Sequence, residues 1–176
     1  LAKAKNFVAR ISNYPIEWLE EPLPADRPEQ EWAELSLASS VPLAAGENLR
    51  GVGDFTKIIS VGHIAVIQPD VCKWGGITGC IKVARKTIKA GKRYCPHYLG
   101  GGIGLLASAH ILAAAGGDGL LELDVNSNPL REGLAMPFPE IKDGNFYMPT
   151  APGLGVEPDF EIVKKYLVSN ATTVSL

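Results

Sequence analysis

Five acidic or imidazole residues recur along this sequence at nearly constant intervals, and each follows a short apolar run. They are Glu20, Glu47, Asp70, His97 and Glu122, separated by 27, 23, 27 and 25 residues. One strand, one helix and their two loops have about this length, so the spacing predicts tandem βα units. In a (β/α)8 barrel, polar residues at the carboxyl ends of the strands gather at one mouth, where catalysis takes place. We therefore expect these five side chains to share one site.

The apolar runs predict the secondary structure of these units. We expect short, mostly buried strands at 16–20, 43–46, 64–68, 93–95 and 119–123. Helical spacing or composition predicts helices at 1–12, 28–39, 54–61, 77–90 and 102–116. In the helix at 77–90, the buried face is expected to hold Ile77, Ile81, Ala84 and Ile88. Strands that alternate with helices favour parallel pairing and right-handed crossovers.

The sequence changes character after Pro129, where Pro and Gly become frequent. Residues 129–176 are expected to form an extended C-terminal segment that packs on the barrel or on another domain. Within it we expect a turn at Asp143-Gly144 and a short helix near 159–168. Residues 1–128 are expected to be the C-terminal part of a barrel. The predicted fold class is therefore α/β, a (β/α)8 TIM-type barrel of which this chain supplies about the last five βα units. An open five-stranded parallel sheet is the alternative.

Charge and composition argue against several classes of partner. The net charge is −2 and no basic stripe is visible, which argues against binding to nucleic acid or to an anionic membrane. No apolar run approaches membrane-spanning length, and the first residues, LAKAKNFVAR, do not resemble a secretory leader. Cys72, Cys80 and Cys95 form no CxxC pair, which favours reduced thiols. These features predict a cytoplasmic protein.

Five strings, in this order and spacing, resemble the second half of an enolase-superfamily barrel: WLEEPLP, PLAAGEN, IQPDVCKWGGITG, CPHYLGGGIGLLASAH and LLELD. The resemblance covers about residues 1–160 and is to the mandelate racemase subgroup of the mandelate racemase/muconate lactonizing enzyme family. Asp70 decides the subgroup, because relatives of muconate lactonizing enzyme carry a catalytic lysine at the matching position. Lys73 matches a different lysine of the family.

The resemblance implies a role for each of the five strand-end residues. Glu20 and Glu47 would bind Mg2+, the implied cofactor. Asp70 and His97 would form a catalytic dyad, and Glu122 would face the substrate carboxylate. His97 suits a base because its ordinary pKa lies near the operating pH, and Mg2+ prefers oxygen ligands such as carboxylates. A second group would contact the substrate or support these residues: Asn48, Lys73 and Trp74.

The implied reaction is Mg-dependent abstraction of the α-proton of a carboxylate substrate through an enediolate intermediate. Acid-sugar dehydration is the leading expectation, with a sugar acid as the small-molecule partner, and a homo-oligomer is expected for the full-length enzyme. A racemase or epimerase of a 2-hydroxy acid or amino-acid derivative is the alternative. A non-catalytic fragment that needs a missing N-terminal half is a further alternative. The third metal ligand, the second-strand base and the capping domain of the family would all precede residue 1.

Overall fold

A computed structural model describes residues 1–168 of the chain, and its centre is a four-stranded parallel sheet. The strands follow the order β1-β2-β3-β4, with bounds β1 Leu19–Glu20, β2 Leu43–Ala45, β3 Val66–Ile67 and β4 Arg93–Tyr94. Each strand pairs in parallel with the next one along the chain. The last eight residues of the predicted C-terminal segment, 169–176, lie outside the described residues.

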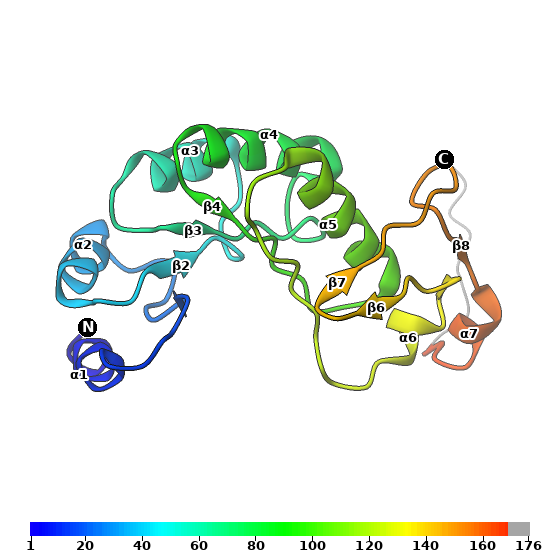
Figure 1. Cartoon of the computed structure of the whole chain (residues 1–176), viewed down its shortest axis with the longest axis horizontal. Coiled ribbons are helices and arrows are strands. Elements are labelled where there is room, and N and C mark those ends of the chain that lie inside the picture. Colours follow the sequence, from blue (N-terminus) through cyan, green and yellow to red (C-terminus); the bar gives the residue numbers. More distant parts are fainter. Residues whose placement is uncertain (169–176) are drawn as a thin grey trace.

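Five helices connect or flank these strands: α1 Ala2–Ile11, α2 Glu29–Ala38, α3 Val52–Ser60, α4 Gly76–Lys89 and α5 Gly102–Ala115. Figure 1 shows α3, α4 and α5 along one side of the strands, with α1 and α2 at the N-terminal end. This alternation confirms the predicted α/β class and is consistent with part of a barrel. Within residues 1–168, no helix combines the length and apolarity that crossing a membrane requires.

The two faces of the sheet are packed differently, because successive side chains of a strand point to opposite sides. One face carries Leu43, Ala45 and Ile67, which join the main core formed with α1 to α4. The other face carries Ala44 and Val66, which pack with Cys95 and Trp18 in a smaller cluster. This second face is the one that becomes the interior of a barrel, and the candidate site residues continue it at the carboxyl ends of the strands.

The predicted fifth strand, 119–123, is not formed. Its residues take no regular structure and lie beside β4, where the Leu120 N–H donates to the Cys95 thiol at 3.3 Å. Gly119 is so close to β4 that an added Cβ would lie 1.9 Å from the Tyr94 carbonyl oxygen. The Leu120 N–H therefore bonds to a thiol, whereas a strand ladder would offer it a backbone carbonyl. The close approach of Gly119 to Tyr94 thus takes the place of regular strand pairing.

The buried face of α4 also differs from the prediction. Its buried residues are Cys80, Val83, Ala84 and Thr87, whereas Ile77 is 48% exposed. The physical reason is that α4 packs against α3 and α5 as well as against β4. The helix is therefore rotated relative to the orientation expected from packing on a sheet alone.

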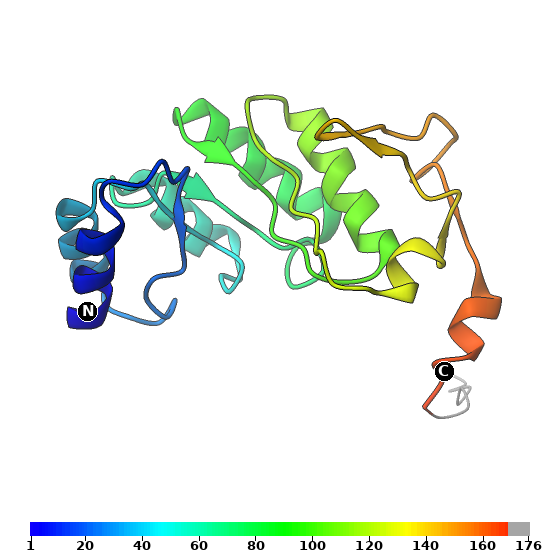
Figure 2. The same cartoon turned by 60° about the horizontal axis from the view of Figure 1, so that its bottom comes forward.

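The C-terminal part contains short elements at the end of the molecule farthest from α1 (Figure 2). They are α6 Pro129–Glu132, β5 Ala135–Met136, β6 Ile141–Lys142, β7 Asn145–Phe146, β8 Glu157–Pro158 and α7 Phe160–Lys164. The predicted turn at Asp143-Gly144 is confirmed, because both residues have positive φ and join the antiparallel pair β6 and β7. The predicted short helix is confirmed as α7.

Candidate functional site

The centre of the candidate site is His97, which follows β4, beside Asp70, which follows β3. His97 is 6% exposed and Asp70 is 5% exposed. The Nδ1 atom of His97 lies 2.9 Å from Asp70 Oδ2. The other carboxylate oxygen, Oδ1, accepts the backbone N–H groups of Cys72 at 2.7 Å and Lys73 at 3.0 Å. The turn after β3 therefore holds the Asp70 carboxylate, and that carboxylate fixes the orientation of the imidazole ring.

The second ring nitrogen of His97 faces two glutamate carboxylates. Nε2 lies 2.8 Å from Glu47 Oε2 and 3.9 Å from Glu122 Oε2. The Lys73 Nζ atom lies 2.9 Å from the other oxygen of Glu47, Oε1. Glu47 is thus held between a lysine and the histidine. Because Asp70 occupies Nδ1, Nε2 is the nitrogen that is placed to exchange a proton with a ligand.

Glu122 completes the group although no strand forms around it. Its Oε2 atom accepts the backbone N–H of Tyr98 at 2.7 Å. Burial raises the pKa of the Glu122 carboxyl above its usual value, while the Tyr98 N–H and the His97 charge act in the opposite direction. The negative charges of Glu20 and Glu47 raise this pKa further. Glu122 therefore lies within the electrostatic influence of both Glu20 and Glu47.

Glu20 is held by two neutral donors at the carboxyl end of β1. Its Oε2 atom accepts from Gln68 Nε2 at 2.8 Å and from Trp18 Nε1 at 3.5 Å. The sequence reasoning missed Gln68, which looked like the end of an apolar strand. The available signal was its place two residues before Asp70, because residues two apart on a strand share one face.

The remaining predicted residues take two kinds of position. Asn48 Nδ2 donates to Glu47 Oε1 at 3.2 Å and to Glu21 Oε2 at 2.9 Å, so it braces the first of these carboxylates. Trp74, in contrast, packs its ring against Phe55 with centroids 5.1 Å apart. This ring packs with core residues of the chain. The residue contacts the strand-end group through its backbone, because the Trp74 N–H donates to the Asp70 carbonyl at 3.0 Å.

Four of the five strand-end residues are thus in direct contact through His97, and Glu20 joins them through its influence on Glu122. Within residues 1–168, no cluster of three or more His, Cys, Asp or Glu side chains is placed to hold a metal ion. Glu20 and Glu47, which the sequence suggested as metal ligands, follow the neighbouring strands β1 and β2.

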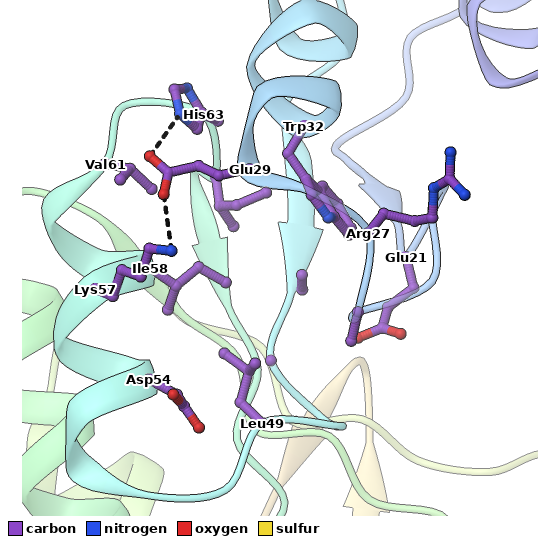
Figure 3. A pocket seen from close by; sticks show the side chains of 14 residues that line it. Glu21, Arg27, Glu29, Trp32, Leu49, Asp54, Lys57, Ile58, Val61 and His63 are labelled. Carbon is purple, nitrogen blue, oxygen red and sulfur yellow. Dashed lines mark ion pairs between the residues drawn. The ribbon is translucent and has the colours of Figure 1, made fainter. Parts of the chain in front are cut away.

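A separate cavity of about 220 Å³ lies between α2 and α3 (Figure 3). Trp32, Leu49 and Ile58 supply apolar lining, and Glu29 forms ion pairs there with Lys57 at 2.9 Å and with His63 at 3.7 Å. None of the five strand-end residues lines this cavity. It lies on the helix side of the sheet, so we do not assign it to the candidate site.

The chain matches a protein family over almost its whole described length. The model of the family described as "Enolase C-terminal domain-like" matches residues 1–162. The chain belongs to this family. The match confirms the resemblance to the C-terminal portion of the enolase superfamily, and the solved relatives below include mandelate racemase/muconate lactonizing enzymes.

Similar solved structures share the fold closely. A mandelate racemase/muconate lactonizing enzyme from Bordetella bronchiseptica RB50 is 48% identical, with a TM-score of 0.88, and the match covers 94% of this chain and 47% of that one. The 3,6-anhydro-D-galactonate cycloisomerase from Zobellia galactanivorans is 26% identical, with a TM-score of 0.86, over 96% of this chain and 47% of that one. These enzymes confirm the barrel assignment of the open sheet.

Among characterised sequences, a D-galactarolactone cycloisomerase from Agrobacterium fabrum (strain C58 / ATCC 33970) is 30% identical over 158 residues. That match covers 84% of this chain and 41% of the relative. The chain therefore spans less than half the length of this relative. The relatives are enolase-superfamily enzymes, among them cycloisomerases.

Proposed function

We propose that the full-length protein abstracts the proton α to the carboxylate of a small substrate, with His97 as the base. The observation that carries this proposal is that the two ring nitrogens of His97 have different partners. Asp70 takes Nδ1, whereas Nε2 faces the carboxylates at the open side of the site. An Asp-held imidazole with one outward nitrogen is an arrangement suited to general base catalysis near neutral pH.

Acid-sugar dehydration is the outcome that we propose for this proton transfer. Nε2 of His97 takes the α-proton, and the electrons of the C–H bond move toward the substrate carboxylate to form an enediolate. The same nitrogen then gives the proton to the departing β-hydroxyl. The enediolate electrons form a double bond between the α- and β-carbons as the C–O bond breaks and water leaves. Two relatives are named for D-galactarolactone and 3,6-anhydro-D-galactonate, which are derivatives of sugar acids, and this supports a substrate of that class.

Glu122 would stabilise the enediolate as charge develops. Its pKa is raised by burial, so the carboxyl is disposed to carry a proton that it can donate to a substrate oxygen. The Tyr98 N–H holds one of its oxygens at 2.7 Å and thereby limits its rotation. Glu122 lies beside the proposed base, with its Oε2 atom 3.9 Å from Nε2 of His97.

Mg2+ fits the donors that the site offers. Mg2+ commonly binds through one or two carboxylates together with substrate and water oxygens. Glu20 and Glu47 would supply the two carboxylates, because both lie at the carboxyl ends of adjacent strands and both act on Glu122 electrostatically. When bound, the ion would supply positive charge for the developing enediolate, the pairing of Mg2+ and base that enolase-superfamily sites use.

A second candidate function is cycloisomerisation of a sugar-acid lactone, which the names of two relatives favour. A racemase or epimerase remains the other alternative. All of these reactions begin with removal of the same α-proton. Incubation of the full-length protein with a sugar-acid library in D2O, followed by NMR and mass spectrometry, separates them. Loss of water indicates dehydration, and an isomer that differs from its substrate only by incorporated deuterium indicates cycloisomerisation or racemisation. Retention of the original α-proton by every compound in the library would contradict the proposal.

Removal of one proposed metal ligand is expected to weaken Mg2+ binding. Replacing Glu47 by glutamine takes away a carboxylate charge, so we expect the Kd for Mg2+ to rise by at least about 10-fold, by analogy with losses at metal-supporting residues. Isothermal titration of the full-length protein measures this change. Asp54→Asn is the matched control, because Asp54 is an exposed carboxylate outside the site. Equal affinities of the wild type and Glu47→Gln would remove Glu47 from the metal site.

Glu122→Gln is expected to lower kcat and kcat/KM together by about 10²-fold, because an amide is a much weaker acid than a carboxyl group and donates a weaker hydrogen bond to a developing oxyanion. The proposed interaction strengthens mainly as charge develops, so substrate binding in the ground state should change little. Steady-state kinetics with the substrate found in the library would measure both constants. A rise in KM with unchanged kcat would instead identify Glu122 as a binding residue.

A further inference from the structure

Gln68 has a buried side-chain amide whose nitrogen and oxygen differ in their hydrogen bonding. The residue follows β3, is 3% exposed, and donates from Nε2 to Glu20 Oε2 at 2.8 Å. Its Oε1 atom is buried without a hydrogen-bond partner among residues 1–168. A buried acceptor without a partner destabilises the fold, because the group has given up its hydrogen bonds to water. An apolar side chain would avoid this cost, so stability alone does not account for an amide at this position.

The backbone around Gln68 is arranged to keep this contact. Gly46, which follows β2, lies so close that an added Cβ would be 2.8 Å from the Gln68 backbone nitrogen and 3.1 Å from its carbonyl carbon. Gly46 also has a φ of +142°, which side chains rarely adopt. The Gln68 N–H donates to the Ala45 carbonyl at 3.0 Å. Any side chain at position 46 would push β3 away from β2 and displace Gln68 from Glu20.

Glu20 and Glu47 differ in the charge of the groups that contact their carboxylates. Glu47 is contacted by the Lys73 ammonium at 2.9 Å and by the His97 imidazole at 2.8 Å. Glu20 is contacted only by neutral donors among the described residues, the Gln68 amide and the Trp18 indole. A neutral donor orients a carboxylate without neutralising its charge. Glu20 is thus held in place with its full attraction for a cation preserved.

We propose that Gln68 is a positioning residue, which holds one oxygen of Glu20 so that this carboxylate is directed to a divalent cation. The inference rests on the proposed function, in which Glu20 is a Mg2+ ligand. Partners that orient metal ligands commonly change metal affinity 10- to 100-fold when they are removed. Gln68 acts through Glu20, so its contribution must disappear when the Glu20 carboxylate is absent.

A double-mutant cycle on Mg2+ affinity tests this dependence. Isothermal titration with MgCl2 would compare full-length wild type, Gln68→Met, Glu20→Gln and the double variant. Gln68→Met keeps the length of the side chain and removes the donor, so we expect a Kd about 10- to 100-fold higher. In the Glu20→Gln background, the same change should alter the Kd less than about 2-fold, the additivity error of such cycles. Thr87→Val is the control, because Thr87 is a fully buried residue of α4 whose hydroxyl has no partner among residues 1–168.

Each outcome decides between the inference and the function on which it rests. Wild-type affinity in Gln68→Met, or an equal loss in both backgrounds, overturns the positioning role but leaves the metal site. No Mg2+ binding by the wild type overturns both. Gln68→Leu provides a second variant without the donor. If thermal melting shows that neither variant folds, Gln68 is a structural residue and the inference is overturned.

Discussion

His97→Asn in the full-length protein is expected to lower exchange of the substrate α-proton with solvent deuterium by about 10²- to 10⁴-fold, the usual contribution of a positioned base. Asparagine is similar in size to part of the imidazole ring and can still donate toward Asp70, but it has no nitrogen that accepts a proton near neutral pH. Proton NMR in D2O follows the loss of the α-proton signal. We expect an effect of this size because Nε2 of His97 is the atom that we propose takes the α-proton.

One control variant and one variant of the His97 partner accompany this test. His63→Asn changes a histidine on the wall of the cavity between α2 and α3, away from the site, and should leave exchange unchanged. Asp70→Asn keeps the size of the side chain, so its effect on the structure should be mild. It removes the carboxylate that holds Nδ1, so it should still be costly in rate, because the tautomer that His97 needs is disturbed. Undiminished exchange in His97→Asn would show that another residue is the base.

The repeating unit was predictable because its signal is local. Short apolar runs followed by a polar residue predicted β1 to β4, and all four strands lie within the predicted ranges. The helices between them begin and end within two residues of the predicted limits. Hydrophobic periodicity and helix-forming composition are properties of neighbouring residues, so they can be recognised without knowledge of the packing.

Features that depend on contacts between distant segments were predicted less well. The run GLLEL at 119–123 has strand composition, but the approach of Gly119 to Tyr94 and the Cys95 thiol acceptor appear only when the two segments are placed together. The buried face predicted for α4 included Ile77, but the observed buried face is shifted by about one residue. The shift arises because α4 packs against α5, which is a tertiary effect. Periodicity identifies a helix more reliably than it identifies the neighbour of that helix.

In the candidate site too, local features were predicted and contacts between distant segments were not. The strand-end positions of Asp70 and His97 were predicted from spacing, and the structure places their side chains 2.9 Å apart. The partners of Glu20 were not predicted, because Gln68 reaches it from a strand that is not its neighbour. That contact depends on the close approach of Gly46 to β3, and a single sequence does not reveal which glycine stands beside which backbone.

Gly119→Ala is expected to be among the most destabilising small substitutions in the chain. The new Cβ would lie 1.9 Å from the Tyr94 carbonyl oxygen and 2.9 Å from Leu112 Cδ1, so the backbone itself must move. Overpacking typically costs about 1–3 kcal/mol, and a conflict with a backbone atom should reach about 3 kcal/mol or more. Urea denaturation of the full-length protein measures the free energy of unfolding.

Gly53→Ala is the matched control for this substitution, because an added Cβ at Gly53 meets no atom within 4 Å and the residue lies inside α3. Alanine there should leave the free energy of unfolding unchanged or raise it by up to about 1 kcal/mol, since glycine is the poorer helix former. The effect of Gly119→Ala should also reach the site. Displacement of segment 119–123 from β4 moves Glu122 away from the Tyr98 N–H, which now holds it at 2.7 Å. A Gly119→Ala protein as stable as the wild type would show that this segment is not pressed against β4, and the placement of Glu122 beside His97 would then lose its structural basis.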